Sequence, residues 1–248
     1  MNSPVLITGF HRSGTSAVAR AFHAAGLHLG ATLLGAEPAN PYGHFEDEAA
    51  IAAHDAALNA EDLTWKSTET ISNRAQAAAK VSDYVASRQA QSSLPWGVKD
   101  PRLCLFLPEW LAASPDASVI FVMRAPGPAI ASLHRRHIRR FVDTSGIDPG
   151  DLDFWKDPDL GLKLWCHYHE QALPALRSHP ATTYIEYGLD DTDTDTAIGQ
   201  AITDLGLTPD PDVVLDIGLG QQATTWFHDP TLLDQAKDLW AAIEDLSQ

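Results

Sequence analysis

Apolar residues recur along the chain with two periods, one typical of strands and one typical of helices. Short apolar or β-branched runs predict strands at residues 5–8, 96–99, 119–123 and 182–187. Apolar residues three and four positions apart predict helices at residues 13–25, 46–58, 74–91, 102–113, from about 126, and at 160–176, 198–205 and 232–246. Strands that alternate with helices form a parallel sheet. We therefore expect an α/β fold of three layers, with a central parallel sheet flanked by helices.

The length of 248 residues fits one domain covering residues 1–248, since a chain of this size buries a core without disulfides or bound metal. Cys104 and Cys166 lie in apolar helical stretches and form no CxxC pair, and no run of about 18 apolar residues occurs. The N-terminus lacks the basic segment of a signal peptide. These features predict a cytoplasmic protein without a transmembrane segment.

Acidic residues outnumber basic residues by 33 to 17, which gives the chain a formal net charge of −16. A surface this negative repels nucleic acid and anionic lipid, so we expect no nucleic-acid partner. Residues 178–236 contain no Lys or Arg. A bound anion therefore has to find its countercharge in the first three quarters of the chain.

The segment Gly-Phe-His-Arg-Ser-Gly-Thr-Ser at residues 9–16 joins the first strand to the first helix. Backbone N–H groups in such a loop and the positive end of the following helix form a cradle for phosphate. The two glycines have the spacing of the GxxxxGK[ST] loop, but Thr15 stands where nucleotide triphosphatases have lysine. ATP or GTP hydrolysis is therefore disfavoured, while Arg12 supplies a cation for a terminal anionic group. The alternative is an ordinary strand-to-helix turn capped by Ser13.

A second candidate segment begins at Arg124, directly after the most apolar strand, with Ser132 eight residues later. Ligands of open α/β sheets collect at the carboxyl ends of the strands, so Arg124 and the loop at 9–16 are expected to meet. Ser132, Arg136 and Arg140 share one helix face through their i, i+4 spacing. The alternative for the basic run at 135–140 is a charged, solvated helix face.

The remaining ionisable candidates lie after a loop rich in glycine and proline and at the end of the second strand. His44, Glu46 and Asp47 follow the loop, and Lys99 and Arg102 follow the strand. A base and a charge-stabilising cation are expected at such places. The alternative for the two carboxylates is a favourable interaction with the helix dipole. The histidines lack metal-ligand spacing such as HExxH, so we predict no metal site.

Together these segments resemble the sulfotransferase superfamily that uses 3′-phosphoadenosine 5′-phosphosulfate, and particularly its bacterial small-sulfotransferase branch, which has a fold like that of P-loop nucleotide-binding proteins. The resemblance covers residues 4 to about 140. Residues 9–16 resemble the family's 5′-phosphosulfate loop, and Val119 through Ser132 resembles its 3′-phosphate motif, a strand followed by Arg-x7-Ser. The segments 40–47 and 96–102 also resemble parts of that branch.

The resemblance implies a role for each candidate residue. Glu46 is the expected general base, with His44 or Asp47 as alternatives, while Lys99 and Arg12 support the leaving group. The family's donor, or its product 3′,5′-bisphosphate, would be bound by His11, Arg12, Ser13, Gly14, Thr15, Ser16, Arg124, Ser132 and Arg136. Arg135 or Arg139 are alternatives to Arg136 as the second cation at the 3′-phosphate, because the final third of the chain lacks the basic lid of other members.

The expected reaction moves a sulfuryl group in line from this donor to a hydroxyl or amine of a small-molecule, lipid or natural-product acceptor. Two alternatives are a P-loop kinase of a small molecule and a nucleotide-binding module without catalysis. Candidates for stacking on adenine are Trp65, Trp226 and Phe227. The sequence leaves open the acceptor, the choice between monomer and homodimer, and whether residues 218–222 form a loop over the nucleotide.

Overall fold

The structure is a computed structural model, which describes residues 3–37, 40–91, 94–143, 152–188, 191–213 and 227–248, with the side chains of 139–143 and 191–192 left aside. In this part of the chain a four-stranded, wholly parallel sheet has the order β2-β1-β3-β4. Its strands are β1 (Val5–Thr8), β2 (Gly97–Lys99), β3 (Ser118–Met123) and β4 (Thr182–Glu186). The predicted parallel α/β fold is confirmed.

The helices fall close to the predicted ranges. They are α1 (Thr15–Ala24), α2 (Glu48–Asn59), α3 (Arg74–Gln91), α4 (Leu103–Ala113), α5 (Pro126–Asp143), α6 (Asp153–Lys156), α7 (Leu160–Ser178), α8 (Asp191–Asp204) and α9 (Pro230–Ser247). The one-turn helix α6 has no counterpart in the prediction. No helix in the described ranges is both long enough and apolar enough to cross a membrane.

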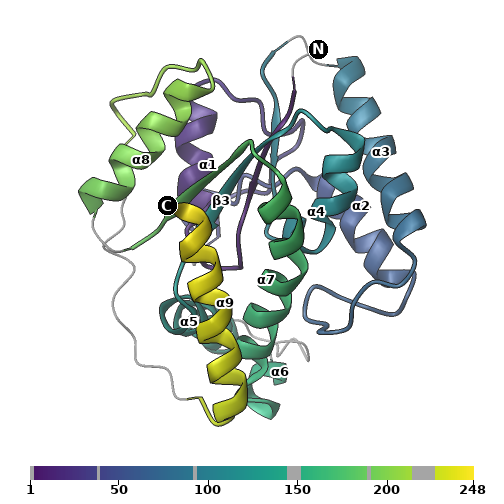
Figure 1. Cartoon of the computed structure of the whole chain (residues 1–248), viewed down its shortest axis with the longest axis vertical. Coiled ribbons are helices and arrows are strands. Elements are labelled where there is room, and N and C mark those ends of the chain that lie inside the picture. The colour runs from purple at the N-terminus through teal and green to yellow at the C-terminus, as the bar shows by residue number, and fades with distance from the viewer. Residues whose placement is uncertain (1–2, 38–39, 92–93, 144–151, 189–190, 214–226) are drawn as a thin grey trace.

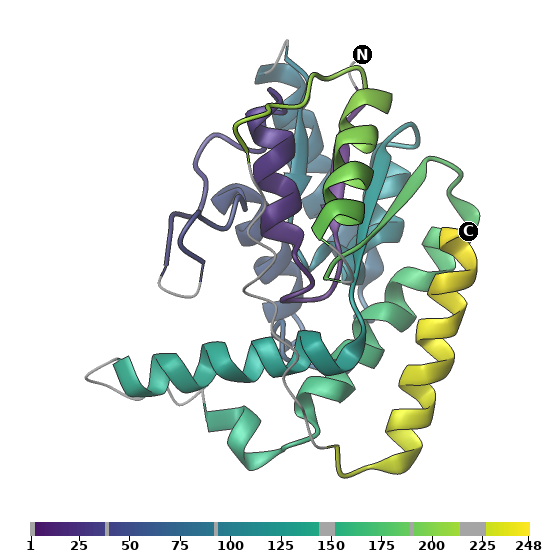
Figure 2. The same ribbon diagram turned by 90° about the vertical axis from the view of Figure 1, so that its left-hand side faces the viewer.

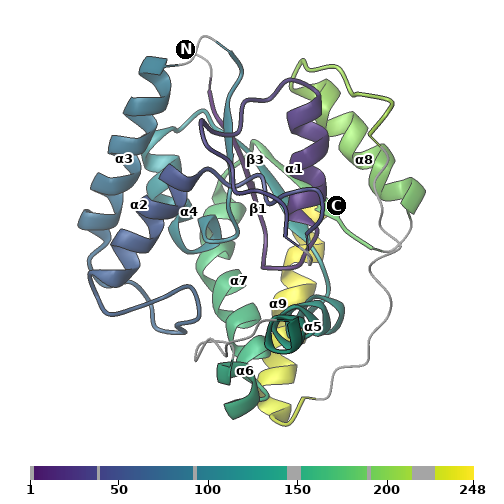
Figure 3. The ribbon, with the colours of Figure 1, turned by 180° about the vertical axis from the view of Figure 1, so that it is seen from behind.

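Side chains that alternate along the strands build a core on each face of the sheet. Leu6 of β1 and Phe121 of β3 face the layer that contains α3, α4, α7 and α9, whereas Ile7 and Val122 face the layer of α1 and α8. Figures 1 and 3 show these two helical layers on opposite sides of the strands. Because both faces are covered, β1, β2 and β3 are almost fully buried, as the apolar run in β3 predicts, whereas the edge strand β4 is only partly buried.

The chain changes direction within the sheet between β1 and β3. From β1 it crosses to β2 on one side, then returns past β1 to β3 on the other side. Such a switch point opens a crevice at the carboxyl ends of the strands, where α/β proteins bind ligands. Helix α5 runs across this end of the sheet, roughly perpendicular to the other long helices (Figure 2).

The starts of α2 and α8 differ from the prediction in ways that involve particular side chains. Helix α2 begins at Glu48 rather than at Glu46, because Asp47 adopts an extended conformation and accepts a hydrogen bond from the backbone N–H of Ala49. Glu46 therefore stays in the loop. Helix α8 begins at Asp191, so the Asp/Thr-rich run belongs to the helix rather than preceding it, and the Thr194 hydroxyl is buried and donates to the carbonyl of Glu186.

Candidate active site

The loop between β1 and α1 has a conformation that exposes the start of a helix. Gly9, Arg12 and Gly14 all have positive φ, at 146°, 67° and 93°. A side chain at Gly9 would collide with the carbonyl oxygen of Val122 on the neighbouring strand. Gly14 is the N-cap of α1 and has no side chain to cap the first N–H groups, so the expected alternative of a Ser13 cap is wrong. Uncapped N–H groups at a helix start form an anion site.

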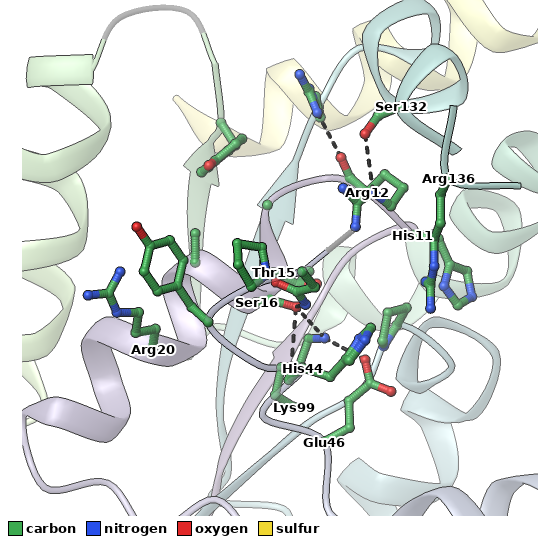
Figure 4. Close-up of a pocket in the computed structure, with 18 residues that line it drawn as sticks. His11, Arg12, Thr15, Ser16, Arg20, His44, Glu46, Lys99, Ser132 and Arg136 are labelled. Atoms are coloured by element: carbon green, nitrogen blue, oxygen red, sulfur yellow. Dashed lines mark hydrogen bonds and ion pairs between the residues drawn. The ribbon is translucent and has the colours of Figure 1, made fainter. Parts of the chain in front are cut away.

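A pocket at this loop concentrates positive charge in an otherwise acidic protein. Its lining includes five basic side chains and one carboxylate, Glu46 (Figure 4). The basic residues are Arg12, Arg20, Lys99, Arg124 and Arg136. Since the whole chain has only 17 Lys and Arg and a net charge of −16, this clustering indicates a site for an anion.

Arg12, Arg124 and Ser132 meet at one end of the pocket, although they come from three different elements. The Nε of Arg12 donates to Ser132 Oγ at 3.1 Å, and Nη1 of Arg124 donates to the carbonyl oxygen of Arg12 at 2.8 Å. Burial, together with the charges of Arg136 and Arg124, lowers the pKa of Arg12 to about 10. A bound anion would relieve this repulsion, because it adds negative charge beside the guanidinium groups.

Glu46 and Lys99 form an ion pair at the opposite end of the pocket. Lys99 Nζ lies 2.6 Å from Glu46 Oε1, and the two residues are 1% and 8% exposed. Lys99 Nζ also donates to Ser16 Oγ at 3.1 Å, as does the side-chain amide of Asn40. The predicted base and the predicted cation are therefore held together beside the start of α1.

His11 and His44 line the same pocket as neutral imidazoles. The Tyr168 hydroxyl donates to the carbonyl of Trp65, so it accepts the 3.2 Å hydrogen bond from His11 Nε2. Burial first, and then nearby cations including Arg102, keep the pKa of His11 well below its usual value. Burial also lowers the pKa of His44, whose Nε2 lies 3.6 Å from Glu37 Oε2.

Several sequence candidates lie outside the pocket lining. Asp47 caps α2 with one carboxylate oxygen and accepts from the Tyr84 hydroxyl at 2.7 Å with the other, so its role is structural. Trp65 and Phe227 pack against the core. Trp226, the segment 218–222 and the Arg139 side chain lie outside what the structure describes.

Four polar or aromatic residues of the pocket lining were not among the sequence candidates: Arg20, Asn40, Tyr42 and Tyr187. Tyr187 directly follows β4, and its ring lies against Gly14. Ligands of α/β proteins gather where parallel strands end, and this rule led to Arg124 after β3. Applied to β4, the same rule predicts Tyr187 as a site residue. Tyr42 packs under Arg20, whose guanidinium carbon lies 4.0 Å from the ring centroid, and this contact between residues 22 positions apart leaves no sequence signal.

The comparison with known families adds an independent observation. The profile of the sulfotransferase family matches residues 4–188, which is about three quarters of the chain. The chain belongs to the sulfotransferase family. Its match extends beyond the segments that carried the sequence resemblance and includes β4 and Tyr187. No curated protein matches the sulfotransferase chain significantly in sequence.

Solved structures of bacterial sulfotransferases have the same fold. A sulfotransferase from Alicyclobacillus acidocaldarius is 14% identical, with a TM-score of 0.54 over 100% of this chain and 96% of that one. Sulfotransferase STF9 from Mycobacterium avium is 13% identical, with a TM-score of 0.59 over 98% of this chain and 76% of that one. The sulfotransferase domain of the curacin biosynthetic pathway is also 13% identical, with a TM-score of 0.56 and coverages of 97% and 98%.

Proposed function

We propose that this sulfotransferase moves a sulfuryl group from 3′-phosphoadenosine 5′-phosphosulfate to a hydroxyl or amine of a small-molecule or lipid acceptor. The observation that carries the proposal is the pocket itself, in which five cations and an uncapped helix start face one carboxylate within a chain of net charge −16. Burial, and then the charges of Arg136 and Arg124, lower the pKa of Arg12, which is consistent with mutual repulsion among these cations. Such a site fits a ligand with several anionic groups.

The loop at residues 9–16 would hold the 5′-phosphosulfate. The N–H groups of Gly14, Thr15 and Ser16 lie at the start of α1 without a side-chain cap, whereas the N–H of Ser13 donates to the carbonyl of Phe10 at 3.1 Å and Ser13 does not line the pocket. The bound donor supplies an activated sulfuryl group. Arg12 and Lys99 would stabilise the negative charge that develops on the bridging oxygen as its bond to sulfur breaks, because fixed cations in a buried site stabilise developing charge without reorganising.

Arg124 and Ser132 would bind the 3′-phosphate, with Arg136 as the second cation. Ser132 Oγ accepts from Arg12, so its own proton remains for a phosphate oxygen. Arg136 lies one helical turn after Ser132 and lines the same pocket. Two tyrosines line the pocket, Tyr42 and Tyr187, and their rings would offer apolar surface to the purine.

Glu46 would accept the proton of the acceptor. Its Oε1 is engaged by Lys99, whereas Oε2 lies 3.9 Å from the nearest nitrogen of Arg102 and is the oxygen left for an incoming hydroxyl or amine. As that proton moves to Glu46, the acceptor atom forms its bond to sulfur and the bridging oxygen leaves with the electron pair. His44, whose imidazole is neutral and lines the pocket, is the alternative base.

Calorimetry with 3′-phosphoadenosine 5′-phosphate tests the donor class, with ATP and adenosine 5′-phosphosulfate as comparison ligands. We expect micromolar binding that requires the 3′-phosphate and weakens about tenfold or more in Arg124→Ala, since charge-assisted hydrogen bonds contribute roughly 1.5–3 kcal/mol each. Arg177→Ala, an exposed arginine in the last turn of α7, is the matched control and should leave the affinity unchanged.

Other outcomes would favour the alternative functions. Tighter binding of ATP than of the 3′-phosphorylated nucleotide would favour a kinase, although Thr15 replaces the lysine that kinases of this loop type use. Nucleotide binding together with donor turnover that is unchanged in both Glu46→Gln and His44→Gln would contradict the assigned base. A change of less than twofold in Arg124→Ala would remove Arg124 from the donor site.

A further inference from the structure

A series of buried hydrogen bonds runs from Trp110 and His54 in the core to Asp100, which lies between the pocket-lining residues Lys99 and Pro101. Trp110 Nε1 donates to His54 Nε2 at 2.9 Å, and His54 Nδ1 lies 2.9 Å from Asp100 Oδ2. All three residues are fully buried. Because the indole N–H can only donate, Nε2 of His54 carries no proton, so Nδ1 carries the proton that is donated to Asp100. The stacking of His54 on Phe106, with centroids 4.7 Å apart, fixes the plane of the imidazole.

Asp100 in turn fixes the position of the Arg102 side chain. Its Oδ1 accepts from the backbone N–H of Arg102 at 2.8 Å and from Nη1 at 3.1 Å, and its Oδ2 lies 3.2 Å from the same Nη1. Burial disfavours the ionised carboxylate, but the charge of Arg102 and the His54 hydrogen bond outweigh it and keep the pKa of Asp100 well below its usual value. Asp100 is therefore an ionised, immobile partner for the guanidinium.

Arg102 is the last member of this series of contacts and lies beside Glu46. Its Nη1 lies 3.9 Å from Glu46 Oε2, while Lys99 engages Oε1 of the same carboxylate. On its other side, Arg102 Nε lies 3.1 Å from Asp55 Oδ1 of α2. Arg102 itself does not line the pocket, so its contact with the pocket chemistry runs through Glu46.

We propose that Arg102, held by the buried His54–Asp100 pair, is a positioning residue that fixes the orientation and the charge of the Glu46 carboxylate. The inference rests on the proposed function, in which Glu46 accepts the acceptor proton. Two cations beside two different oxygens favour one orientation of the carboxylate, with Oε1 on Lys99 and Oε2 toward Arg102. A buried ion-pair network contributes little net stability compared with apolar residues of similar volume, so stability alone does not account for it.

The test compares Arg102→Gln with Arg102→Lys, using release of sulfate from the donor with water as the acceptor, from pH 5 to pH 9. Arg102→Gln should lower kcat about tenfold, because a misplaced base reduces the rate even though binding is intact. It should also move the acidic limb of kcat to higher pH, since a cation beside the carboxylate is lost. Arg102→Lys keeps the positive charge but loses the forked guanidinium group. It should leave the acidic limb of the kcat profile at the same pH. Affinity for 3′-phosphoadenosine 5′-phosphate should stay within twofold in both.

Two further variants separate positioning from folding. Arg74→Gln is the matched control, because Arg74 is also partly buried and bonds to Glu109 and to the Leu105 carbonyl but has no contact with Glu46. It should leave the pH profile unchanged. If Arg102→Gln does not fold, Asp100→Asn/Arg102→Gln removes both charges together and should move the acidic limb in the same direction by a smaller amount, because loss of the Asp100 carboxylate partly offsets loss of the guanidinium.

The outcomes distinguish this inference from the proposed function. An unchanged acidic limb and kcat in folded Arg102→Gln, with an active wild type, overturns the positioning role and leaves the donor assignment intact. A wild type that neither binds 3′-phosphoadenosine 5′-phosphate nor consumes the donor overturns the proposed function and the inference with it. A loss of nucleotide affinity that equals the loss of kcat would make Arg102 a donor-site residue instead and would also overturn the inference.

Discussion

The ring of Tyr187 lies against Gly14 so closely that a Cβ on Gly14 would overlap the ring. This contact joins the end of β4 to the N-cap of α1 and closes one side of the pocket. Two independent constraints, the positive φ of 93° and the aromatic ring, therefore require glycine at this position.

Gly14→Ala should abolish nucleotide binding and lower the melting temperature, because it forces both backbone strain and displacement of Tyr187. We expect at least a tenfold loss of affinity for 3′-phosphoadenosine 5′-phosphate by calorimetry. Gly199→Ala in α8 is the control, since nothing lies within 4 Å of its added Cβ. That change should raise stability by about 0.5–1 kcal/mol. Full binding by Gly14→Ala would mean that the loop can rearrange around the methyl group.

The Glu46–Lys99 pair predicts a separation of stability from activity. Lys99→Met should destabilise the fold by about 3 kcal/mol, since it leaves the Glu46 carboxylate buried without its main partner. Glu46→Gln/Lys99→Met removes both charges and should recover most of that loss in urea unfolding. Donor turnover should stay abolished in the double variant, and recovery of turnover along with stability would show that neither residue acts in the reaction.

Buried histidines predict a loss of stability on acidification. Burial lowers the pKa of His169 to about 4, so the folded protein keeps this imidazole neutral while the unfolded chain protonates it near 6.5. The contribution of neutral His169 to the free energy of unfolding is fully present above pH 6.5 and is lost as the pH falls toward 4. The loss is about 2 kcal/mol by pH 5. Urea unfolding at pH 7 and pH 5 measures it. His169→Phe should reduce this pH dependence, and an unaltered slope would assign it to other groups.

Ser132→Ala tests whether this hydroxyl serves the ligand or only Arg12. The change removes the acceptor of the 3.1 Å hydrogen bond from Arg12 Nε and a donor to the proposed 3′-phosphate. We expect affinity for 3′-phosphoadenosine 5′-phosphate to fall about fivefold, consistent with roughly 1 kcal/mol for one hydrogen bond. Affinity for adenosine 5′-phosphosulfate, which has no 3′-phosphate, should change less than twofold. Equal losses for both nucleotides would assign Ser132 to the positioning of Arg12 alone.

The parts of the site that the sequence predicted are those that depend on local geometry. A glycine loop between a strand and a helix, and an arginine at the end of an apolar strand, have positions that follow from strand order and strand direction. Arg12 and Arg124 therefore meet as expected. The α2 boundary at Asp47 was missed because it depends partly on the hydroxyl of Tyr84, which reaches it from α3. Tertiary partners of this kind leave no periodic signal in the sequence.

For the same reason, the sequence did not predict the series of buried hydrogen bonds that runs from Trp110 to Arg102. Arg102 was noted beside Lys99, but nothing in the spacing links it to His54, 48 positions earlier, or to Glu46. Those neighbours come together only when α2 packs beside the loop that leads from β2 into α4. Sequence reasoning thus identified the groups that would contact a ligand more readily than those that hold them in place.

Ser16 Oγ receives hydrogen bonds from Lys99 and Asn40 and donates to the carbonyl of His44 at 3.4 Å. One hydroxyl at the start of α1 thereby connects the loop at residues 9–16, the proposed phosphate-binding loop, to the segment that leads to Glu46. Linkage between two sites is reciprocal, so a nucleotide that orders this helix start also orders the acceptor side of the pocket. In binding terms, the donor would raise the affinity for the acceptor, and the acceptor would raise the affinity for the donor by the same factor.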